Sequence, residues 1–207
     1  MKDAWIERWN QTYSAKEYVY GKEPNAYLKL QLDKLDAGTI LFPAEGEGRN
    51  AVYAAKQNWQ VSAFDISSEG REKALQLAKE NYVEIDYRIG GVSEVDFKPE
   101  QFDAIAIIFA PFPADTRMRS FKKLEQYLRK DGLFIFEVFS KTHLEYNSKN
   151  PNVGGPKSAE FLFSVDEMKE YFPDYKIIEL VETEVELHEG LFHNGIGSVI
   201  RFVGQKI

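Results

Sequence analysis

The stretch Ile40–Asp65, ILFPAEGEGRNAVYAAKQNWQVSAFD, decides the fold of this 207-residue chain. The apolar run at 39–42 is typical of a buried strand. A glycine-containing turn follows at 43–48, then a helical pattern over 50–58, and then a second strand over 60–64. Strand, turn, helix and strand in this order predict a parallel βαβ unit.

The turn and the end of the second strand have the features of a nucleotide pocket. Gly46 and Gly48 lack the Cβ atom that would keep a ligand away from the backbone. The helix that begins near Asn50 has unpaired N–H groups at its N-terminus, and these favour a carboxylate or a phosphate. Asp65 can accept hydrogen bonds from both hydroxyl groups of a ribose. We therefore predict an adenosine-type pocket; the alternatives are a tight turn without a ligand and an aspartate that caps a turn or a helix.

The spacing of these residues separates the nucleotide classes. A dinucleotide enzyme usually has a third glycine, where this chain has Ala51, and a second nucleotide-binding half, which is absent here. A P-loop requires Gly-Lys-Ser/Thr, and Gly48-Arg49-Asn50 does not provide it. S-adenosylmethionine has an adenosine but no phosphate, and its carboxylate suits a helix N-terminus. A nicotinamide oxidoreductase is the weakest of the candidate functions.

The rest of the chain continues the alternation of helices and strands. The patterns predict further helices at 3–14, 24–35, 68–81, 117–128 (closed by Lys130-Asp131-Gly132) and 165–171 (capped by Ser164 and Glu167), and further strands at 85–89, 103–109, 133–139, 176–187 and 198–203. The last two strands are joined by a segment too short for a crossover helix, so they should pair antiparallel. We predict an α/β, Rossmann-like fold of five βα repeats and a C-terminal antiparallel hairpin. Its seven-stranded sheet is mostly parallel, with helices on both faces.

The composition excludes several classes of function. The net charge is -7, and the densest basic cluster, Arg117, Arg119, Lys122 and Lys123, is predicted to be a solvated helix face, so we expect no nucleic-acid partner. The absence of cysteine excludes disulfides and thiolate catalysis. No signal peptide and no apolar stretch long enough for a membrane span is present, so we expect a cytoplasmic protein without a membrane partner.

Several motifs resemble those of one family. EGEGRNAVYAAK followed by AFD, and LRKDGLFIFEVFS at 128–140, are similar to motifs of class I S-adenosylmethionine-dependent methyltransferases. WIERW at 5–9, YVYG at 18–21 and EPN at 23–25 resemble the subgroup related to tellurite-resistance and thiopurine methyltransferases, as do HEGLFHNG and SVIRFVG near the C-terminus.

This resemblance implies a single domain over residues 1–207, in which 1–35 form a helical cap over the cofactor site. The implied activity is S-adenosylmethionine-dependent methyl transfer to a small molecule such as a thiol or a metalloid oxyanion. The alternative is a non-catalytic protein that binds an adenosyl ligand. The implied cofactor-binding residues are Trp5, Trp9, Tyr20, Ala44, Glu45, Gly46, Gly48, Asp65, Ile66, Gly91, Val92, Phe109 and Ala110.

The chain departs from the family pattern at a few of these positions. Phe42 and Ala44 replace the usual acid and glycine of the first motif, and Gly91 replaces an aspartate near the adenine. Pro111 stands where many members have a polar or aromatic residue. Glu45 or Glu47 is the candidate for the carboxylate that pairs with the methionine ammonium.

No catalytic residue follows from the sequence, because methyl transfer from a sulfonium requires alignment rather than a fixed triad. His188 and His193 flank the turn of the terminal hairpin; one is a candidate base near the substrate, and the alternative is a surface histidine. The spacing of the three histidines predicts no metal site. Residues 147–158 are turn-rich and expected to be mobile, and they form either a substrate lid or a plain long loop.

Overall fold

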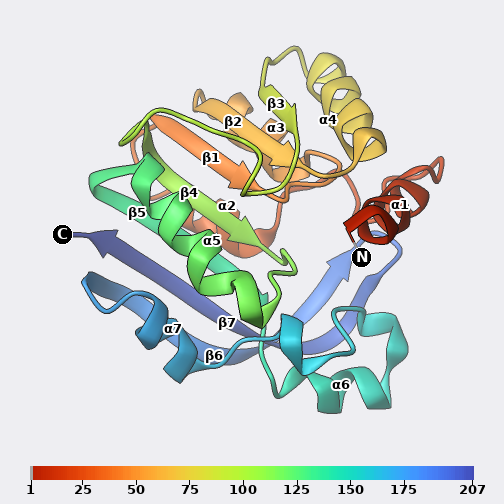
Figure 1. Ribbon diagram of the computed structural model, residues 1–207. Helices are drawn as coiled ribbons and strands as arrows, with labels where there is room; N and C mark the ends of the chain where they lie inside the picture. The colour runs from red at the N-terminus through yellow and green to blue at the C-terminus, as the bar shows by residue number, and fades with distance from the viewer. Residues whose placement is uncertain (1) are drawn as a thin grey trace.

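The computed structural model describes residues 2–207, and the strands of this part of the chain form one seven-stranded sheet in the order β3-β2-β1-β4-β5-β7-β6 (Figure 1). Neighbouring strands from β3 to β5 are parallel, and β7 runs antiparallel between β5 and β6. The predicted fold class is therefore confirmed. The strands are β1 (Thr39–Pro43), β2 (Gln60–Asp65), β3 (Asp86–Ile89), β4 (Phe102–Ile108), β5 (Leu128–Phe139), β6 (Tyr175–Glu189) and β7 (His193–Lys206).

Helices cover both faces of the sheet. They are α1 (Lys2–Tyr13), α2 (Ala26–Leu32), α3 (Arg49–Lys56), α4 (Ser68–Glu80), α5 (Ala114–Tyr127), α6 (His143–Lys149) and α7 (Val165–Tyr171), with short 3₁₀ turns η1 (Pro151–Val153) and η2 (Ala159–Phe161). The capping box predicted for α7 is present, because Ser164 and Glu167 each accept a hydrogen bond from the other's backbone N–H. Pro24, however, lies outside α2, because Asn25 caps that helix by accepting from Leu28 N–H at 2.8 Å.

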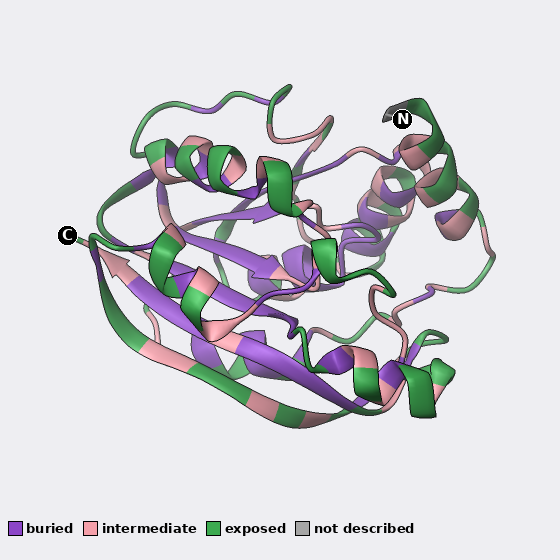
Figure 2. Cartoon of the chain, turned by 60° about the horizontal axis from the view of Figure 1, so that its bottom comes forward, coloured by how far each residue is buried: buried purple, intermediate pink, exposed green. Residues whose placement is uncertain are grey.

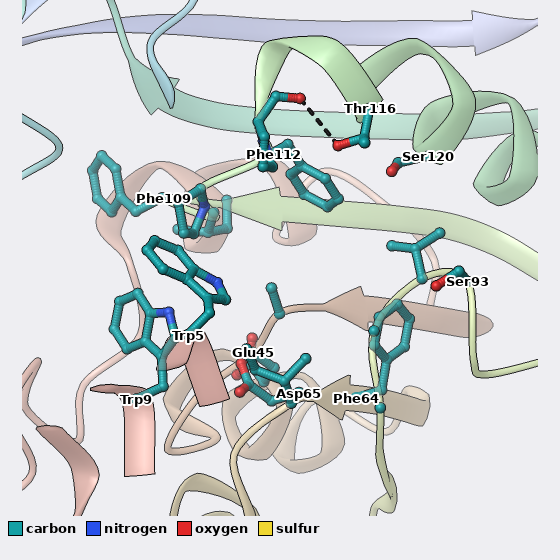
Figure 3. Close-up of a pocket in the computed structure, with 18 of the residues that line it drawn as sticks. Trp5, Trp9, Glu45, Phe64, Asp65, Ser93, Phe109, Phe112, Thr116 and Ser120 are labelled. Carbon is teal, nitrogen blue, oxygen red and sulfur yellow. Dashed lines mark hydrogen bonds between the residues drawn. The ribbon is translucent and has the colours of Figure 1, made fainter. Parts of the chain in front are cut away.

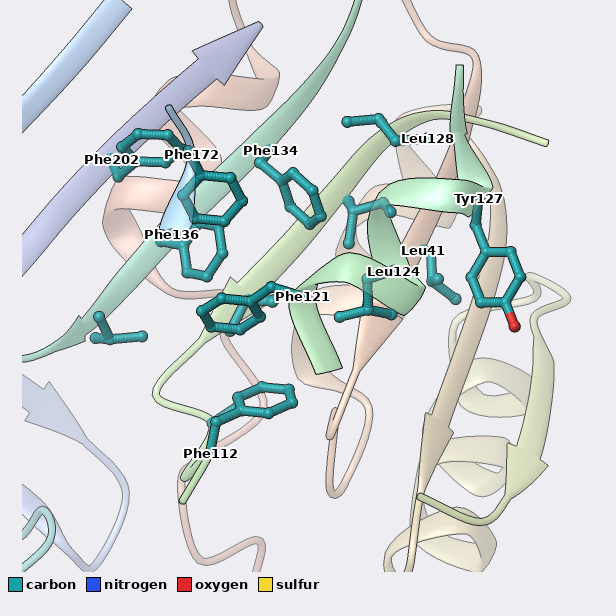
Figure 4. Close-up of a cluster of buried hydrophobic side chains, with 14 of the residues drawn as sticks. Leu41, Phe112, Phe121, Leu124, Tyr127, Leu128, Phe134, Phe136, Phe172 and Phe202 are labelled. Atoms are coloured by element: carbon teal, nitrogen blue, oxygen red, sulfur yellow. The ribbon is translucent and has the colours of Figure 1, made fainter. Parts of the chain in front are cut away.

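Alternation along the strands divides the interior into two cores. Leu41 faces a core under α5 and α7, whereas its neighbours Ile40 and Phe42 face a second core under α2, α3 and α4. Phenylalanine dominates the first core, in which Phe121 of α5 packs against Phe136 of β5 (Figure 4). Buried residues occupy the central strands, while β6 at the edge is largely exposed or half-buried (Figure 2). Phe42, which replaces the family's acid, is thus a core residue and does not block the turn.

Two predicted connections differ from the structure. The segment between β3 and β4, residues 90–101, forms turns and no helix, so one of the five expected βα repeats lacks its helix. Lys130-Asp131-Gly132 does not close α5, because α5 ends at Tyr127 and β5 begins at once. The left-handed residue there is Asp131, at φ 62°, where the register of β5 against β4 shifts.

The segment 147–158 has more regular structure than a plain loop, and none of its residues lines the cavity described below. It contains the end of α6 and the whole of η1, and Val153 is fully buried against the hairpin. The carbonyl of Gly154 lies 3.0 Å from Nε2 of His143, which anchors the segment to α6. Tertiary contacts therefore order a stretch whose composition alone is typical of a loop.

The strand order reverses beside β1, with β2 on one side and β4 on the other. In open α/β sheets this switch point creates a crevice at the carboxyl ends of the strands. Those ends point towards α1 (Figure 1). The fold therefore places the end of β1, the end of β2 and helix α1 around one site.

Candidate functional site

A cavity of about 360 Å³ opens at this switch point. Trp5 and Trp9 of α1, Asp65 at the end of β2 and Phe109 after β4 contribute to its wall (Figure 3). The wall combines flat aromatic surfaces with a few polar groups, which is the usual character of a small-molecule site.

The structure gathers ten of the thirteen predicted cofactor residues around this cavity. They are Trp5, Trp9, Tyr20, Ala44, Glu45, Asp65, Ile66, Gly91, Val92 and Phe109. Gly46, Gly48 and Ala110 lie outside the lining. Ala110 is 4% exposed and belongs to the phenylalanine-rich core, while Phe109, at φ 51°, contributes to the cavity wall instead.

The two glycines of the turn have a role in packing. A Cβ on Gly48 would lie 2.5 Å from Cβ of Ala74 in α4, and one on Gly46 would lie 2.6 Å from the hydroxyl oxygen of Tyr13. Both residues have positive φ angles, +63° for Gly46 and +86° for Gly48, which favour glycine. The glycines thus allow α1 and α4 to pack closely on the turn, a role that the sequence did not predict.

Asp65 is the buried acid of the cavity wall. Its Oδ1 accepts from the N–H of Ser67 at 2.8 Å, and its Oδ2 accepts from the N–H of Gly46 at 3.1 Å. Burial raises the pKa of Asp65 to about 6, although these backbone hydrogen bonds lower it in part. Each oxygen keeps further lone-pair capacity for a ligand hydroxyl.

Glu45 caps the helix that follows it. Its Oε1 accepts from the backbone N–H groups of Asn50 at 2.9 Å and Ala51 at 2.8 Å. The N-terminal donors of α3, expected to bind a ligand carboxylate, are therefore already partly used by the protein itself. Burial raises the pKa of Glu45 to about 7. Two acids were candidates to pair with the methionine ammonium, and of these only Glu45 lines the cavity. Glu47 lies outside the lining and forms an ion pair with Lys73 at 2.7 Å.

Aromatic rings close one end of the cavity. The rings of Trp5 and Trp9 meet edge to face with centroids 6.0 Å apart, and Trp9 stacks on Tyr13 at 5.4 Å. Trp5 also stacks on Phe161 of η2 at 5.4 Å. These contacts fix α1 beside the cavity and place several aromatic rings in its wall, which is a favourable setting for a cation.

The two hairpin histidines have different surroundings. His188 is exposed, with 73% of its side chain accessible, and lies 3.3 Å from Glu186. His193 is 4% exposed, lines the cavity and lies 2.9 Å from Glu189. The sequence did not show which of the two histidines lies near the substrate, because it does not tell which side of the hairpin turn faces the cavity.

Other lining residues were not predicted from the sequence. Arg49, Asn50 and Phe64 lie within two residues of predicted ones, and Tyr13 lies one helical turn after Trp9; proximity along the chain is the only signal that points to them. Thr116, Arg119 and Ser120 come from α5, where no motif marks them. The basic cluster of α5 is not one solvated face, because Arg117 is fully buried and donates to the carbonyl groups of Phe112, Leu162 and Glu160.

Within residues 2–207 no helix is long and apolar enough to span a membrane. The same part of the chain contains no cluster of three or more histidine or carboxylate side chains that could hold a metal ion.

Comparisons with known proteins support the assignment of this fold. Residues 40–132 match the methyltransferase domain family. Together with the fold, this match confirms the predicted resemblance to class I S-adenosylmethionine-dependent methyltransferases, whose cofactor is S-adenosylmethionine.

The chain also resembles TehB. It is 21% identical over 185 residues to the probable S-adenosyl-L-methionine-dependent methyltransferase TehB of Haemophilus influenzae, covering 86% of this chain and 61% of TehB. The chain thus spans about three fifths of the length of this curated relative. The crystal structure of TehB from Haemophilus influenzae matches with a TM-score of 0.71 at 15% identity over 98% of this chain and 67% of that one.

Two further solved structures share the fold. A structure described as "Conversion of a Disulfide Bond into a Thioacetal Group during Echinomycin Biosynthesis" gives a TM-score of 0.79 at 16% identity, over 98% of this chain and 92% of that one. Magnesium protoporphyrin IX methyltransferase from Synechocystis PCC 6803, solved with bound SAH, gives 0.67 at 14% identity over 98% of this chain and 85% of that one.

Proposed function

We propose that this protein transfers the methyl group of S-adenosylmethionine to a small-molecule acceptor, a thiol or a metalloid oxyanion. The observation that carries the proposal is the Asp65 carboxylate, which is only 6% exposed and yet lines the cavity with lone pairs to spare. Burying a carboxylate is costly, and a site that recognises a ribose through its two hydroxyls is a physical reason to keep one there.

The residues of the cavity fit this cofactor in chemical type. Asp65 would hold the ribose hydroxyls, and Ile66, Gly91 and Val92 would border the adenine. Ala44 and Glu45 would face the methionine part, with the second carboxylate oxygen of Glu45 available to the ammonium group. The cofactor supplies a methyl group activated by a sulfonium, and the remaining residues would face that end: Trp5, Trp9, Tyr20 and Phe109.

We also propose that residues 1–35 form a cap over this site within a single domain. The support comes from α1, whose Tyr13 packs on the turn at Gly46 and whose Asn10 accepts a hydrogen bond of 2.7 Å from Ser67. Both contacts join α1 to the two loops that would hold the ribose. Met1 lies outside the described residues.

The relatives support sulfur or metalloid chemistry at the acceptor. The echinomycin structure is described as converting a disulfide into a thioacetal, a reaction at sulfur. The resemblance to TehB and the tellurite-resistance subgroup favours an oxyanion of a metalloid instead. A direct assay is needed to choose between these two classes.

Calorimetry and mass spectrometry test the proposal together. Calorimetric titration with S-adenosylmethionine and S-adenosylhomocysteine should give saturable one-site binding, which Asp65→Ala weakens. A panel of alkyl thiols, aryl thiols, tellurite and selenite, incubated with methyl-labelled cofactor, should yield a labelled product with at least one acceptor class. Absence of binding would overturn the assignment of the pocket. Binding without product from any acceptor would favour the non-catalytic adenosyl-binding alternative.

A further inference from the structure

The C-terminal hairpin brings an imidazole and a carboxylate together at the cavity. Glu189 ends β6 and His193 begins β7, and the two residues are paired in register across the turn. Nδ1 of His193 lies 2.9 Å from Oε2 of Glu189, and the same oxygen lies 2.9 Å from Nη2 of Arg49 in α3. All three side chains are 11% exposed or less.

We propose that His193 is the general base of the reaction and takes the proton of a thiol acceptor on Nε2, while Glu189 and Arg49 position its ring. This inference rests on the proposed function and narrows the acceptor to a protonated sulfur nucleophile.

Hydrogen bonding fixes the tautomer that this role requires. Burial raises the pKa of Glu189, but the hydrogen bond from His193 and the charge of Arg49 outweigh it and lower that pKa to about 2. The ionised carboxylate only accepts hydrogen bonds, so Nδ1 of His193 must donate and its proton resides there. Nε2 then carries the lone pair, and it makes no hydrogen bond within residues 2–207. Burial also lowers the pKa of His193, and the hydrogen bond to Glu189 offsets this lowering only in part. The ring is therefore neutral near pH 7.

The walls around His193 favour a neutral acceptor. Its ring centroid lies 4.6 Å from that of Tyr20, 5.0 Å from that of Phe109 and 5.3 Å from that of Phe139. A charged oxyanion that enters this aromatic enclosure would lose strong hydration, whereas a neutral thiol has little hydration to lose. A thiol has a pKa of about 8.5, so a neutral imidazole can take its proton as the sulfur attacks the methyl carbon. Phe109 also faces the end proposed for the sulfonium, so the base and the methyl group share one wall.

The proposed step is balanced and requires no oxidant. The proton of the thiol moves to Nε2 of His193, and the thiol sulfur forms a bond to the methyl carbon. The bond from that carbon to the sulfonium sulfur breaks, and its electron pair stays on the cofactor sulfur. His193 then returns its proton to water. The titratable or charged groups that face the ring are Glu189 of β6, Arg49 of α3, His143 of α6 and the phenol of Tyr20.

Acceptors of different acidity test the role of the base. An aryl thiol with a nitro group is already ionised at pH 7.5, whereas an alkyl thiol is not. His193→Gln should lower kcat/KM for the alkyl thiol by about 100-fold or more and for the aryl thiol by less than about 5-fold. His188→Gln, the exposed histidine of the same hairpin, is the matched control and should change neither value. Equal losses for both thiols in His193→Gln would overturn the proposal.

A measurement without turnover keeps the proposal testable if a variant folds poorly. The chain has three histidines, so ¹⁵N spectra of the ligand-free protein can be assigned with single His→Gln variants. At pH 7.5 His193 should be protonated on Nδ1 and bare on Nε2, and Glu189→Gln should shift this balance towards the other tautomer. A ring that is charged, or protonated on Nε2, at that pH in the wild-type protein would overturn the proposal. Cofactor binding is measured in parallel to separate the two claims. If the wild-type protein does not bind the cofactor, the proposed function itself is contradicted. If the cofactor binds normally but His193 has the wrong tautomer, only the role of His193 is contradicted.

Discussion

The backbone N–H of Gly46 donates a hydrogen bond of 3.1 Å to Oδ2 of Asp65, and so joins the turn after β1 to the end of β2. The acid proposed to hold the ribose is therefore oriented by the same turn that carries the first motif. Its other oxygen is held by the N–H of Ser67 at the start of α4. Two backbone donors thus fix a carboxylate that burial would otherwise drive towards its neutral form.

Replacing Asp65 by Ala should weaken S-adenosylhomocysteine binding by about 5- to 150-fold, the equivalent of about 1–3 kcal/mol, because the ribose loses its hydrogen-bond acceptor. Calorimetry measures this loss, and circular dichroism checks that the variant is folded. Asp86→Ala, which removes an exposed acid of the next strand, is the control. Unchanged affinity in Asp65→Ala would contradict the proposed position of the ribose.

Glu45→Gln should raise the free energy of unfolding of the ligand-free protein at pH 8. We expect this gain to exceed the effect of the same substitution at pH 4 by about 2–4 kcal/mol. The pKa of Glu45 is raised to about 7, so its contribution to stability is complete below its unfolded value and is lost as the pH rises through 7. Glutamine keeps Oε1 on the N–H groups of Asn50 and Ala51 but carries no charge. Urea unfolding between pH 4 and pH 8 measures the difference.

Two further variants separate the charge of Glu45 from its capping role. Glu45→Ala removes the cap of α3 as well, and should cost about 1 kcal/mol at pH 4, where the glutamine variant costs little. Glu84→Gln, at an exposed position, should leave the pH dependence as in the wild-type protein. A pH dependence that is the same in Glu45→Gln and in the wild-type protein would show that the carboxyl group does not titrate in this range.

Trp9→Leu should weaken binding of S-adenosylmethionine by about 2- to 5-fold more than binding of S-adenosylhomocysteine, because only the former carries a sulfonium for the aromatic face. The ratio of the two dissociation constants is the readout. A change in the packing of α1 that weakens both ligands equally leaves this ratio unchanged. Tyr82→Ala, at a residue that is 96% exposed, is the control. A ratio unchanged by Trp9→Leu would place the sulfonium elsewhere.

Gly48→Ala should destabilise the protein by about 2 kcal/mol or more, because φ is positive and the new Cβ would lie 2.5 Å from Cβ of Ala74. Gly91→Ala is the matched variant at the cavity, where the nearest atoms would be 3.6 Å away, and its stability should change little. Thermal unfolding of both variants tests the packing role of Gly48. Equal stability of Gly48→Ala and the wild-type protein would contradict it.

Much of the fold could be predicted because local patterns specify it. The apolar runs of β1 and β4 and the helical spacing of α3 and α4 depend on neighbours along the chain, and these elements form within a few residues of their expected bounds. The junction of α5 with β5 could not be predicted, because pairing with β4 begins at Leu128 and overrides the turn pattern of residues 130–132. Segment 147–158 was misjudged for a related reason, since burial of Val153 orders a sequence that is locally a loop.

By itself the sequence determined the order of the elements, the sheet type and most of the residues at the carboxyl ends of its strands. Periodicity and turn chemistry act over short distances, and parallel strands with crossover helices must bring those ends together. Only the tertiary structure decided how the polar groups there are used: Glu45 caps α3, the glycines admit Tyr13 and Ala74, and His193 faces the cavity while His188 faces solvent. Those outcomes depend on burial and on hydrogen bonds between residues far apart in the chain, which no local pattern encodes.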